Sequence, residues 1–161
     1  MSLEKDMHYM QMALEQAEIA GKKGEVPVGA VLLLENGVVY SAHNAPITES
    51  DATAHAEIQV IRAACRSLGN YRLAGSTLYV SLEPCSMCAG AIIHARIDRL
   101  VYGAEDKKTG AVHSLYRLLS DPRLNHQAEV QSGLMADECG QVLCDFFAER
   151  RRQKKISSKN S

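Results

Sequence analysis

The chain has 161 residues, of which 46% are apolar and 23% are charged, and its formal net charge is -1. A chain of this length forms one ordinary domain that buries about 68–70% of its unfolded surface. The composition excludes a disordered chain, a collagen-like fibre and a coiled coil. No apolar run approaches the roughly 18 residues of a membrane span, and the N-terminus lacks the apolar core of a secretory signal. We therefore expect a protein of the reducing cytoplasm with no membrane segment.

The charge is unevenly distributed along the chain. Residues 149–161 hold six Lys or Arg and one Glu, whereas the rest of the chain holds 12 basic and 18 acidic side chains. A basic end on an acidic body suggests an anionic partner that is reached by one face. The alternative, a solvated helix end with a frayed tail, stays open at this level.

The apolar pattern predicts one alternating series of helices and strands. Helical spacing of apolar residues marks the helices, buried apolar runs mark the strands, and Asn36-Gly37 is a strong turn signal between the first two strands. In chain order the expected elements are helix 3–20, strand 26–34, strand 38–42, helix 54–68, strand 76–82, a helix that carries residues 85–95, strand 99–103, short helix 114–119, strand 129–132 and helix 136–154.

This order indicates the fold class. An opening hairpin followed by strand–helix alternation predicts an α/β domain in which one mixed sheet is covered by helices on both faces. The expected architecture is a three-layer α-β-α sandwich with a five-stranded mixed sheet. We expect a single domain over residues 1–155, followed by a basic and polar tail at 156–161.

The five cysteines are an odd number, so complete pairing within the chain is impossible. Only Cys85 and Cys88 have a metal-like spacing, C-x-x-C, which in a reducing compartment points to metal binding or redox chemistry. A redox dithiol and half of a structural zinc knuckle are competing interpretations. Cys65, Cys139 and Cys144 lie on apolar helical stripes and are interpreted as small core residues, and nothing local supports Cys139 as a further ligand.

Two predicted helix starts carry the residues that suggest chemistry. Cys85 and Cys88 are three residues apart, so they face the same way on a helix and gain from its dipole. With His55 they make three protein ligands and leave one position for a water, as in catalytic zinc sites, where zinc lowers the pKa of that water to about 7. Glu57 points about 200° around the helix from His55. We therefore expect it to move the water's proton to the substrate rather than to bind the metal.

H-x-E at 55–57 followed by P-C-x-x-C at 84–88 is the signature of the zinc-dependent nucleoside and nucleobase deaminases. Over about residues 8–155 the chain also resembles the bacterial tRNA-specific adenosine deaminases. The segments that carry this resemblance are EVPVGAVL at 25–32, HN-x-P at 43–46, TAHAEI at 53–58, NYRL at 70–73, TLYVSLEPCSMCAGAIIHARI at 77–97, D-x-KTGA at 106–111, NH at 125–126, G-x-x-x-x-EC at 133–139 and DFF-x-x-RR at 145–151.

The resemblance implies a cytidine-deaminase-like fold, a homodimer and one zinc ion (Zn2+) per subunit. It also implies conversion of adenosine to inosine at the wobble position of the anticodon of an arginine tRNA, with the anticodon stem-loop as partner. The residues that match the family's site are the zinc ligands His55, Cys85 and Cys88, the proton shuttle Glu57, the adenosine-binding Asn44, the anticodon-contacting Asp106 and Lys108, and a second RNA-contacting position, Asn125.

The chain departs from the family pattern on the expected RNA side, where His113 replaces a small residue and Lys107 varies. Two other function classes stay open: a deaminase of a free base or nucleoside such as guanine or cytidine, and a non-catalytic zinc-stabilised binding module. The D-x-KTG loop and the basic residues at 150–155, which we expect to run beside tRNA phosphates, favour RNA editing over the first. Glu57 argues against the second, because a structural zinc site does not need it.

Overall fold

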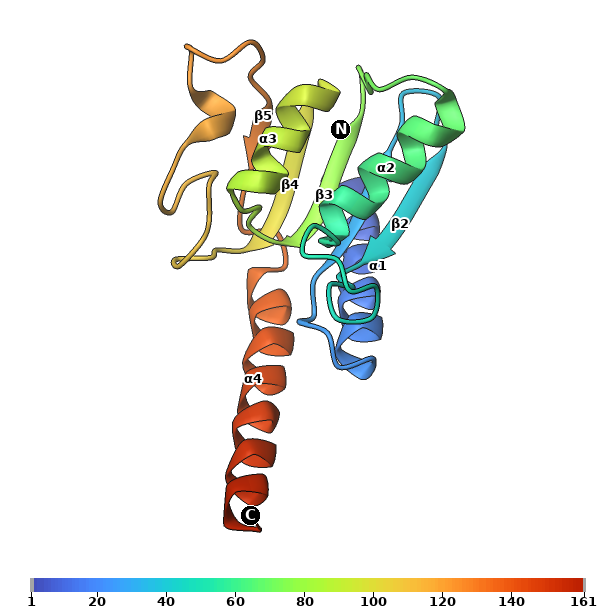
Figure 1. The fold of residues 1–161 in the computed structure, drawn as a ribbon. Coiled ribbons are helices and arrows are strands. Elements are labelled where there is room, and N and C mark those ends of the chain that lie inside the picture. The colour runs from blue at the N-terminus through green and yellow to red at the C-terminus, as the bar shows by residue number, and fades with distance from the viewer. Residues whose placement is uncertain (1, 161) are drawn as a thin grey trace.

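In the computed structural model, which describes residues 2–160, one five-stranded sheet lies between two layers of helices (Figure 1). The strand order is β2-β1-β3-β4-β5, with β1 antiparallel to both of its neighbours and β4 parallel to both of its own. The three-layer α-β-α prediction is therefore confirmed. The elements are α1 (Leu3–Lys22), β1 (Gly29–Leu33), β2 (Val39–His43), α2 (Ala56–Leu68), β3 (Thr77–Leu82), α3 (Ser86–Ala95), β4 (Arg99–Ala104), the 3-10 turn η1 (Leu118–Ser120), β5 (Glu129–Gln131) and α4 (Ala136–Lys159).

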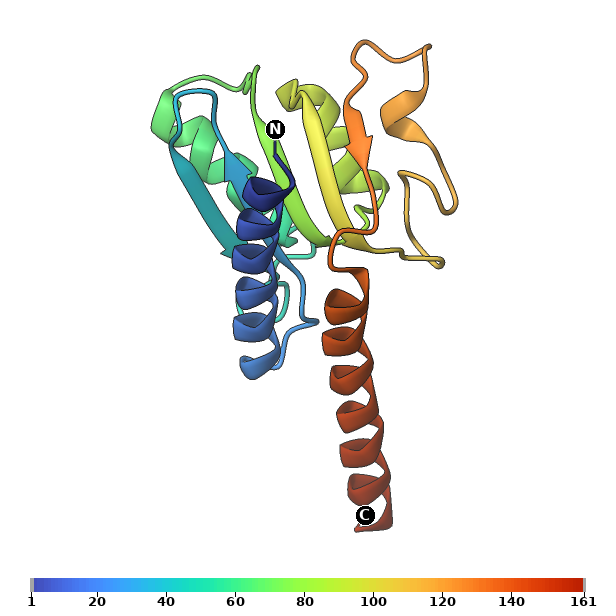
Figure 2. The same ribbon diagram turned by 180° about the vertical axis from the view of Figure 1, so that it is seen from behind.

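Both faces of the sheet are buried, which explains why its central strands are apolar without alternation. Successive strand residues point to opposite faces, so Leu32 joins one core cluster and Val31 joins the other. Helices α2 and α3 cover the first face, and α1 and α4 cover the second, as the view from behind shows (Figure 2).

Helix α1 begins and packs as its sequence dictates. The Ser2 hydroxyl accepts a hydrogen bond from the backbone N–H of Lys5 at 3.2 Å and caps the helix. Helix α1 packs against strand β1, which starts with Gly29. A Cβ atom at this position would collide with the Ala13 carbonyl of the helix. The glycine therefore allows the helix to lie directly on the strand, on the face of the sheet opposite to α2 and α3.

Several predicted boundaries differ from the structure. Strand β1 starts later than the expected residue 26, and Pro27 has no N–H to donate to a ladder. Helix α2 starts at Ala56, with His55 as its N-cap in an extended conformation. Strand β5 ends at Gln131, one residue before the predicted end.

The predicted helix at 114–119 is wrong, because only the turn η1 forms there. The backbone N–H groups of Val112, His113 and Ser114 donate to the carboxylate of Glu83, at 3.1, 2.9 and 3.0 Å. The N–H of Leu115 donates to the Gly110 carbonyl at 2.9 Å. The N–H of Leu118 donates to the Ala111 carbonyl at 3.1 Å, and not to the Ser114 carbonyl that a helix would use, so the segment stays an irregular loop.

Helix α4 ends at Lys159 rather than at 154, so residues 156–159 of the expected tail are helical. Its first turns pack on the sheet through Cys139, which is 1% exposed. From Phe147 to Asn160 every residue is exposed, and this end of the helix projects away from the sheet (Figures 1 and 2). Across residues 2–160, no helix combines the length and apolar character that a membrane span requires.

Candidate metal and catalytic site

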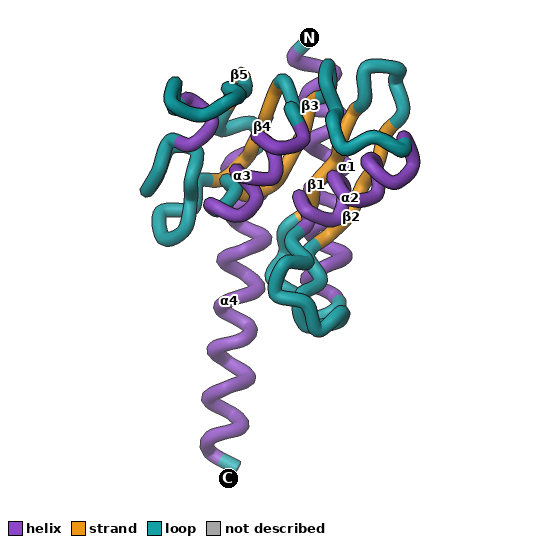
Figure 3. The backbone as a smooth tube through the Cα atoms, turned by 45° about the horizontal axis from the view of Figure 1, so that its top comes forward, coloured by secondary structure: helices purple, strands orange, loops and turns teal. Residues whose placement is uncertain are grey.

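The starts of α2 and α3, which contact each other on one face of the sheet, form the site (Figure 3). His55 and Cys85 are the N-caps of these helices, and neither side chain caps its own helix. Their side chains point toward each other instead, with Cys88 one turn further along α3. The Nδ1 atom of His55 lies 3.6 Å from the Cys85 sulfur and 3.5 Å from the Cys88 sulfur.

This donor set fits zinc. The three ligand atoms of His55, Cys85 and Cys88 all lie within 4.8 Å of one another. A tetrahedral zinc with one nitrogen and two sulfur ligands places each nitrogen–sulfur pair roughly 3.6 Å apart, which agrees with both measured separations. Hydrogen bonds from Cys88 and His55 lower the pKa of the Cys85 thiol to about 4, which favours the thiolate that metals bind.

A cavity of about 200 Å³ opens on this cluster and is lined by His55, Cys85, Glu57 and Asn44, among others. The Glu57 side chain is 4% exposed, and burial raises its carboxyl pKa above the usual value. Its carboxyl group also interacts with Cys88. A carboxyl group with a raised pKa therefore lies next to the three candidate ligand atoms, and its role in proton transfer stays a prediction.

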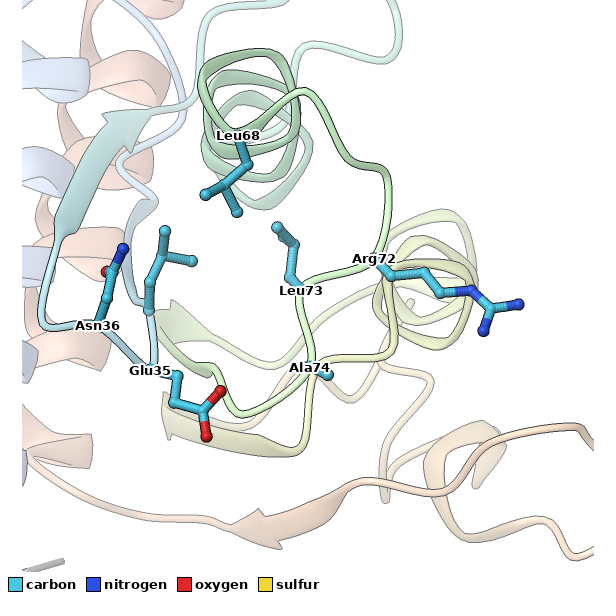
Figure 4. A pocket seen from close by; sticks show the side chains of 7 residues that line it. Glu35, Asn36, Leu68, Arg72, Leu73 and Ala74 are labelled. Atoms are coloured by element: carbon cyan, nitrogen blue, oxygen red, sulfur yellow. The ribbon is translucent and has the colours of Figure 1, made fainter.

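A second cavity, of about 270 Å³, lies at the other end of the sheet, between the β1–β2 turn and the end of α2 (Figure 4). Arg72 belongs to its lining but points away from it, and Leu68 and Leu73 face each other across it. Among the described residues that line it there is neither His nor Cys. The chemistry-bearing side chains are therefore concentrated at the first cavity.

The predicted substrate-binding residues take different positions. Asn44 is 8% exposed and faces the catalytic cavity. Asp106 also lines it, but its carboxylate accepts hydrogen bonds from the N–H groups of Lys108 and Thr109, at 3.1 and 3.2 Å, and from the Thr109 hydroxyl at 2.7 Å. Asp106 therefore shapes its own loop as well as the wall of the cavity.

The remaining positions on the expected RNA side lie further out. Lys107 and Lys108 are exposed beside a neighbouring hollow that the loop forms with α4. His113 lies beside β4, with its Nδ1 atom 2.6 Å from the hydroxyl of Tyr102 in that strand. Asn125 is exposed between η1 and β5, outside the lining of the catalytic cavity, so its RNA contact stays a prediction.

The other cysteines separate into different environments. Cys139 belongs to the core on the α1 and α4 face, so it is not available to the metal cluster on the opposite face. Cys65 is half-buried against the core, as predicted. The core prediction for Cys144 is wrong, because this side chain is exposed on the outer side of α4.

Sequence reasoning missed two buried glutamates that hold the loops around the cavity. Glu25 accepts hydrogen bonds from the N–H groups of Ile47 and Thr48, at 3.1 and 2.6 Å, in the loop that leads to α2. Glu83 holds the loop after β4, and its backbone and side-chain donors keep its pKa at about 2 in spite of burial. Glu25 directly precedes an apolar run of the sequence and Glu83 directly follows one, and an acidic residue at either end of an apolar run is the signal that identifies them.

Comparison with known proteins defines the class first. The family model for the cytidine and deoxycytidylate deaminase zinc-binding region matches residues 3–104. A guanine deaminase from Nitrosomonas europaea shares the fold, with a TM-score of 0.76 at 22% identity over 88% of this chain and 84% of that chain. The fold and the site thus define a deaminase of the zinc-binding class, with the cytidine-deaminase-like fold that the sequence predicted.

More similar proteins define the family within that class. A tRNA-specific adenosine deaminase of Bacillus subtilis is 50% identical over 155 residues, which cover 96% of each chain. A solved structure from studies of A-to-I editing by tRNA deaminases at the wobble position is 52% identical, with a TM-score of 0.81, and covers 84% of this chain and 99% of that chain. The chain therefore belongs to the tRNA-specific adenosine deaminase family of hydrolytic enzymes.

Proposed function

We propose that this protein hydrolyses adenosine to inosine at the wobble position of a tRNA anticodon, with an arginine tRNA as the natural substrate. The observation that carries the proposal is the cluster of His55, Cys85 and Cys88 with Glu57 in the same small cavity. Family membership, with 50% identity over almost the whole chain, supports the choice of tRNA over a free base.

His55, Cys85 and Cys88 would hold the zinc ion, which when bound supplies a Lewis acid that lowers the pKa of water to about 7. Glu57 accepts a proton from the attacking water and delivers it to the ring nitrogen next to the reacting carbon. It then delivers the second proton to the leaving amino group, so that adenosine and water give inosine and ammonia. Its raised pKa suits this task, because a group that both takes and gives protons works best when its pKa lies near the operating pH.

The cavity suits one base taken out of its stack. It is smaller than the roughly 300–1,000 Å³ of sites for drug-sized ligands, so an RNA loop enters only by extruding the reacting base. Asn44 lies in the wall where it would bind that base, with Asp106 in the loop on the other side. The exposed Lys107 and Lys108 lie outside the cavity, where the flanking phosphates would pass.

The assembly and setting are part of the same proposal: a homodimer with one zinc per subunit, acting on tRNA in the cytoplasm. Large apolar side chains that are exposed near the loop after β4, Leu115, Tyr116 and Leu124, offer a surface for a second copy to cover. Sedimentation gives the assembly mass, and elemental analysis gives the zinc content per chain. A monomer, or a chain that binds no zinc, would contradict this part of the proposal.

Activity on an anticodon stem-loop and on free adenosine, cytidine and guanine tests the function. We expect inosine at the wobble position of the stem-loop and barely any turnover of free adenosine. Both substrates present the same ring atoms to Glu57, but only the stem-loop has phosphates and neighbouring bases whose binding energy positions the reacting carbon. Comparable kcat/KM values for stem-loop and free adenosine would contradict RNA editing and favour a nucleoside deaminase.

A further inference from the structure

Glu83 is a buried carboxylate that the proposed proton transfers leave unused. Its side chain is 2% exposed and lies between the end of β3 and the loop that follows β4. One carboxylate oxygen accepts hydrogen bonds from the Asp106 N–H at 3.1 Å and from the Ser114 hydroxyl at 2.6 Å. The other accepts from the three consecutive N–H groups of residues 112–114. One side chain therefore holds both ends of the segment 106–114.

The same segment is also held against the metal-binding turn. The N–H of Ala111 donates to the Pro84 carbonyl at 2.8 Å, and Gly110 pairs with Cys85 as an isolated β-bridge. The segment therefore runs past the start of α3 (Figure 1), in direct contact with the backbone of a metal ligand. Glu83 itself lies two residues before that ligand.

The backbone at Gly110 packs closely against this anchor. A Cβ atom at Gly110 would collide with the Glu83 carboxylate and with the Asp106 carbonyl. The segment is therefore fixed by its hydrogen bonds to Glu83 and by the close approach of Gly110 to the same side chain. It carries Asp106 and Thr109, which line the catalytic cavity opposite His55 and Glu57.

We propose that Glu83 is a positioning residue that fixes the Asp106–Thr109 wall of the cavity relative to Cys85, so that the reacting base enters a preformed space. This inference rests on the proposed function, since it assigns Glu83 to recognition of the same substrate. A preformed wall avoids the cost of ordering a loop when RNA binds, and small misplacements of a positioning group are costly. His55, Cys88 and Glu57 are held by α2 and α3, so loosening the wall affects binding of the base more than the proton transfers.

The substitution Glu83→Gln tests this positioning role. It keeps the side-chain length but turns an amide NH2 group toward N–H donors. We expect the zinc content to stay unchanged and the KM for the stem-loop to rise roughly tenfold or more. We also expect kcat to change less than about threefold. Amide hydrogen exchange should become faster in residues 106–114 and stay the same in α2. Glu105→Gln is the matched control, because it removes the same charge at an exposed position next to the loop, and it should change neither KM nor exchange.

Ser114→Ala keeps the test valid if Glu83→Gln fails to fold. It removes the hydroxyl donor alone, and a smaller rise in KM with the same local exchange pattern would support the proposal. A fall in kcat with KM unchanged, or unchanged exchange in residues 106–114, would overturn it. If the unaltered enzyme fails to deaminate the stem-loop, the proposed function is wrong, and the exchange experiment then decides alone whether Glu83 holds this wall.

Discussion

Two buried carboxyl groups, Asp6 on one face of the sheet and Glu57 on the other, lie in opposite electrostatic environments. On the face covered by α1 and α4, Asp6 is 2% exposed and forms a two-pronged ion pair with Arg99, at 2.8 and 2.7 Å. The Tyr79 hydroxyl donates a third hydrogen bond to Asp6 at 2.7 Å. The hydrogen bonds from Arg99 lower the pKa of Asp6, whereas on the face covered by α2 and α3 burial raises the pKa of Glu57.

This difference separates a carboxylate that stabilises the fold from one that can carry out chemistry. A fully paired carboxylate stays ionised at neutral pH and holds α1 on β4. A buried carboxyl group with a raised pKa holds a proton more readily than an exposed one, which suits a group that takes and gives protons. The position in the fold, rather than the residue type, decides between the two roles.

Glu57→Gln removes the carboxyl group that we propose to transfer protons, and it has the largest expected effect on activity. The amide cannot accept the proton, and general acid–base groups contribute typically about 10²–10⁴-fold, so kcat should fall by at least that range. Zinc content and thermal stability should be retained. Single-turnover assays measure the catalytic rate, metal analysis measures the zinc content, and thermal unfolding measures the stability. Glu35→Gln, in the second cavity, is the control that should leave kcat unchanged. Loss of zinc from Glu57→Gln would show that Glu57 is a ligand.

Asp6→Asn removes the carboxylate that stabilises the fold, and it should lower the free energy of unfolding without changing kcat. Removing one partner of a buried ion pair costs about 3–5 kcal/mol. We expect the lower end, about 3 kcal/mol, because Arg99 keeps a hydrogen bond to Gln131 at 2.6 Å. Urea unfolding at neutral pH measures the free energy, and stem-loop turnover under native conditions is the control. An Asp6→Asn protein as stable as the unaltered chain would show that the pair contributes nothing.

The pH dependence of this loss of stability tests whether ionised Asp6 pairs with Arg99. The pKa of Asp6 is lower in the folded protein than its ordinary value of 3.8. Its contribution to stability is therefore present above pH 4 and is lost as the pH falls below the unfolded value toward the folded one. The difference in unfolding free energy between the unaltered chain and Asp6→Asn should accordingly shrink between neutral pH and pH 3. A difference that stays constant over this range would contradict the pairing with Arg99.

The sequence predicts local features of both faces and misses features that depend on distant contacts. The order of helices and strands and the spacing of Cys85 and Cys88 are set within a few residues. His55 meets the two cysteines across about 30 residues, and it was predicted from the signature that the three residues share. The helix predicted at 114–119 failed because the N–H of Leu118 donates to the Ala111 carbonyl instead of to the Ser114 carbonyl that a helix would use. Cys144 has the spacing of a core residue, but its side chain is exposed while the neighbouring Val142 and Leu143 pack against the core. Neither outcome is visible until the chain has folded.

The projecting end of α4 gives the smallest expected effect, because residues 147–160 are all exposed. Arg150 is the last tie to the body, with a 3.4 Å hydrogen bond to the Gly24 carbonyl and its guanidinium 5.0 Å from the centre of the Phe146 ring. A chain that ends at Arg150 loses five Lys or Arg side chains, whereas a chain that ends at Ile156 loses only Lys159. Neither truncation removes a buried residue, so thermal stability should be unchanged in both.

If this end of the helix lies beside RNA phosphates, the two truncations should differ in RNA binding. Each phosphate contact that is lost flattens the log–log salt dependence of binding by about 0.7–0.9. The chain ending at Arg150 should therefore bind the full tRNA more weakly at low salt, with a flatter slope, and keep its kcat at saturation. The chain ending at Ile156 should stay close to the full-length protein, which separates the effect of charge from that of length. Equal slopes for all three chains would show that the projecting helix is only solvated, and that recognition resides entirely in the loops around the cavity.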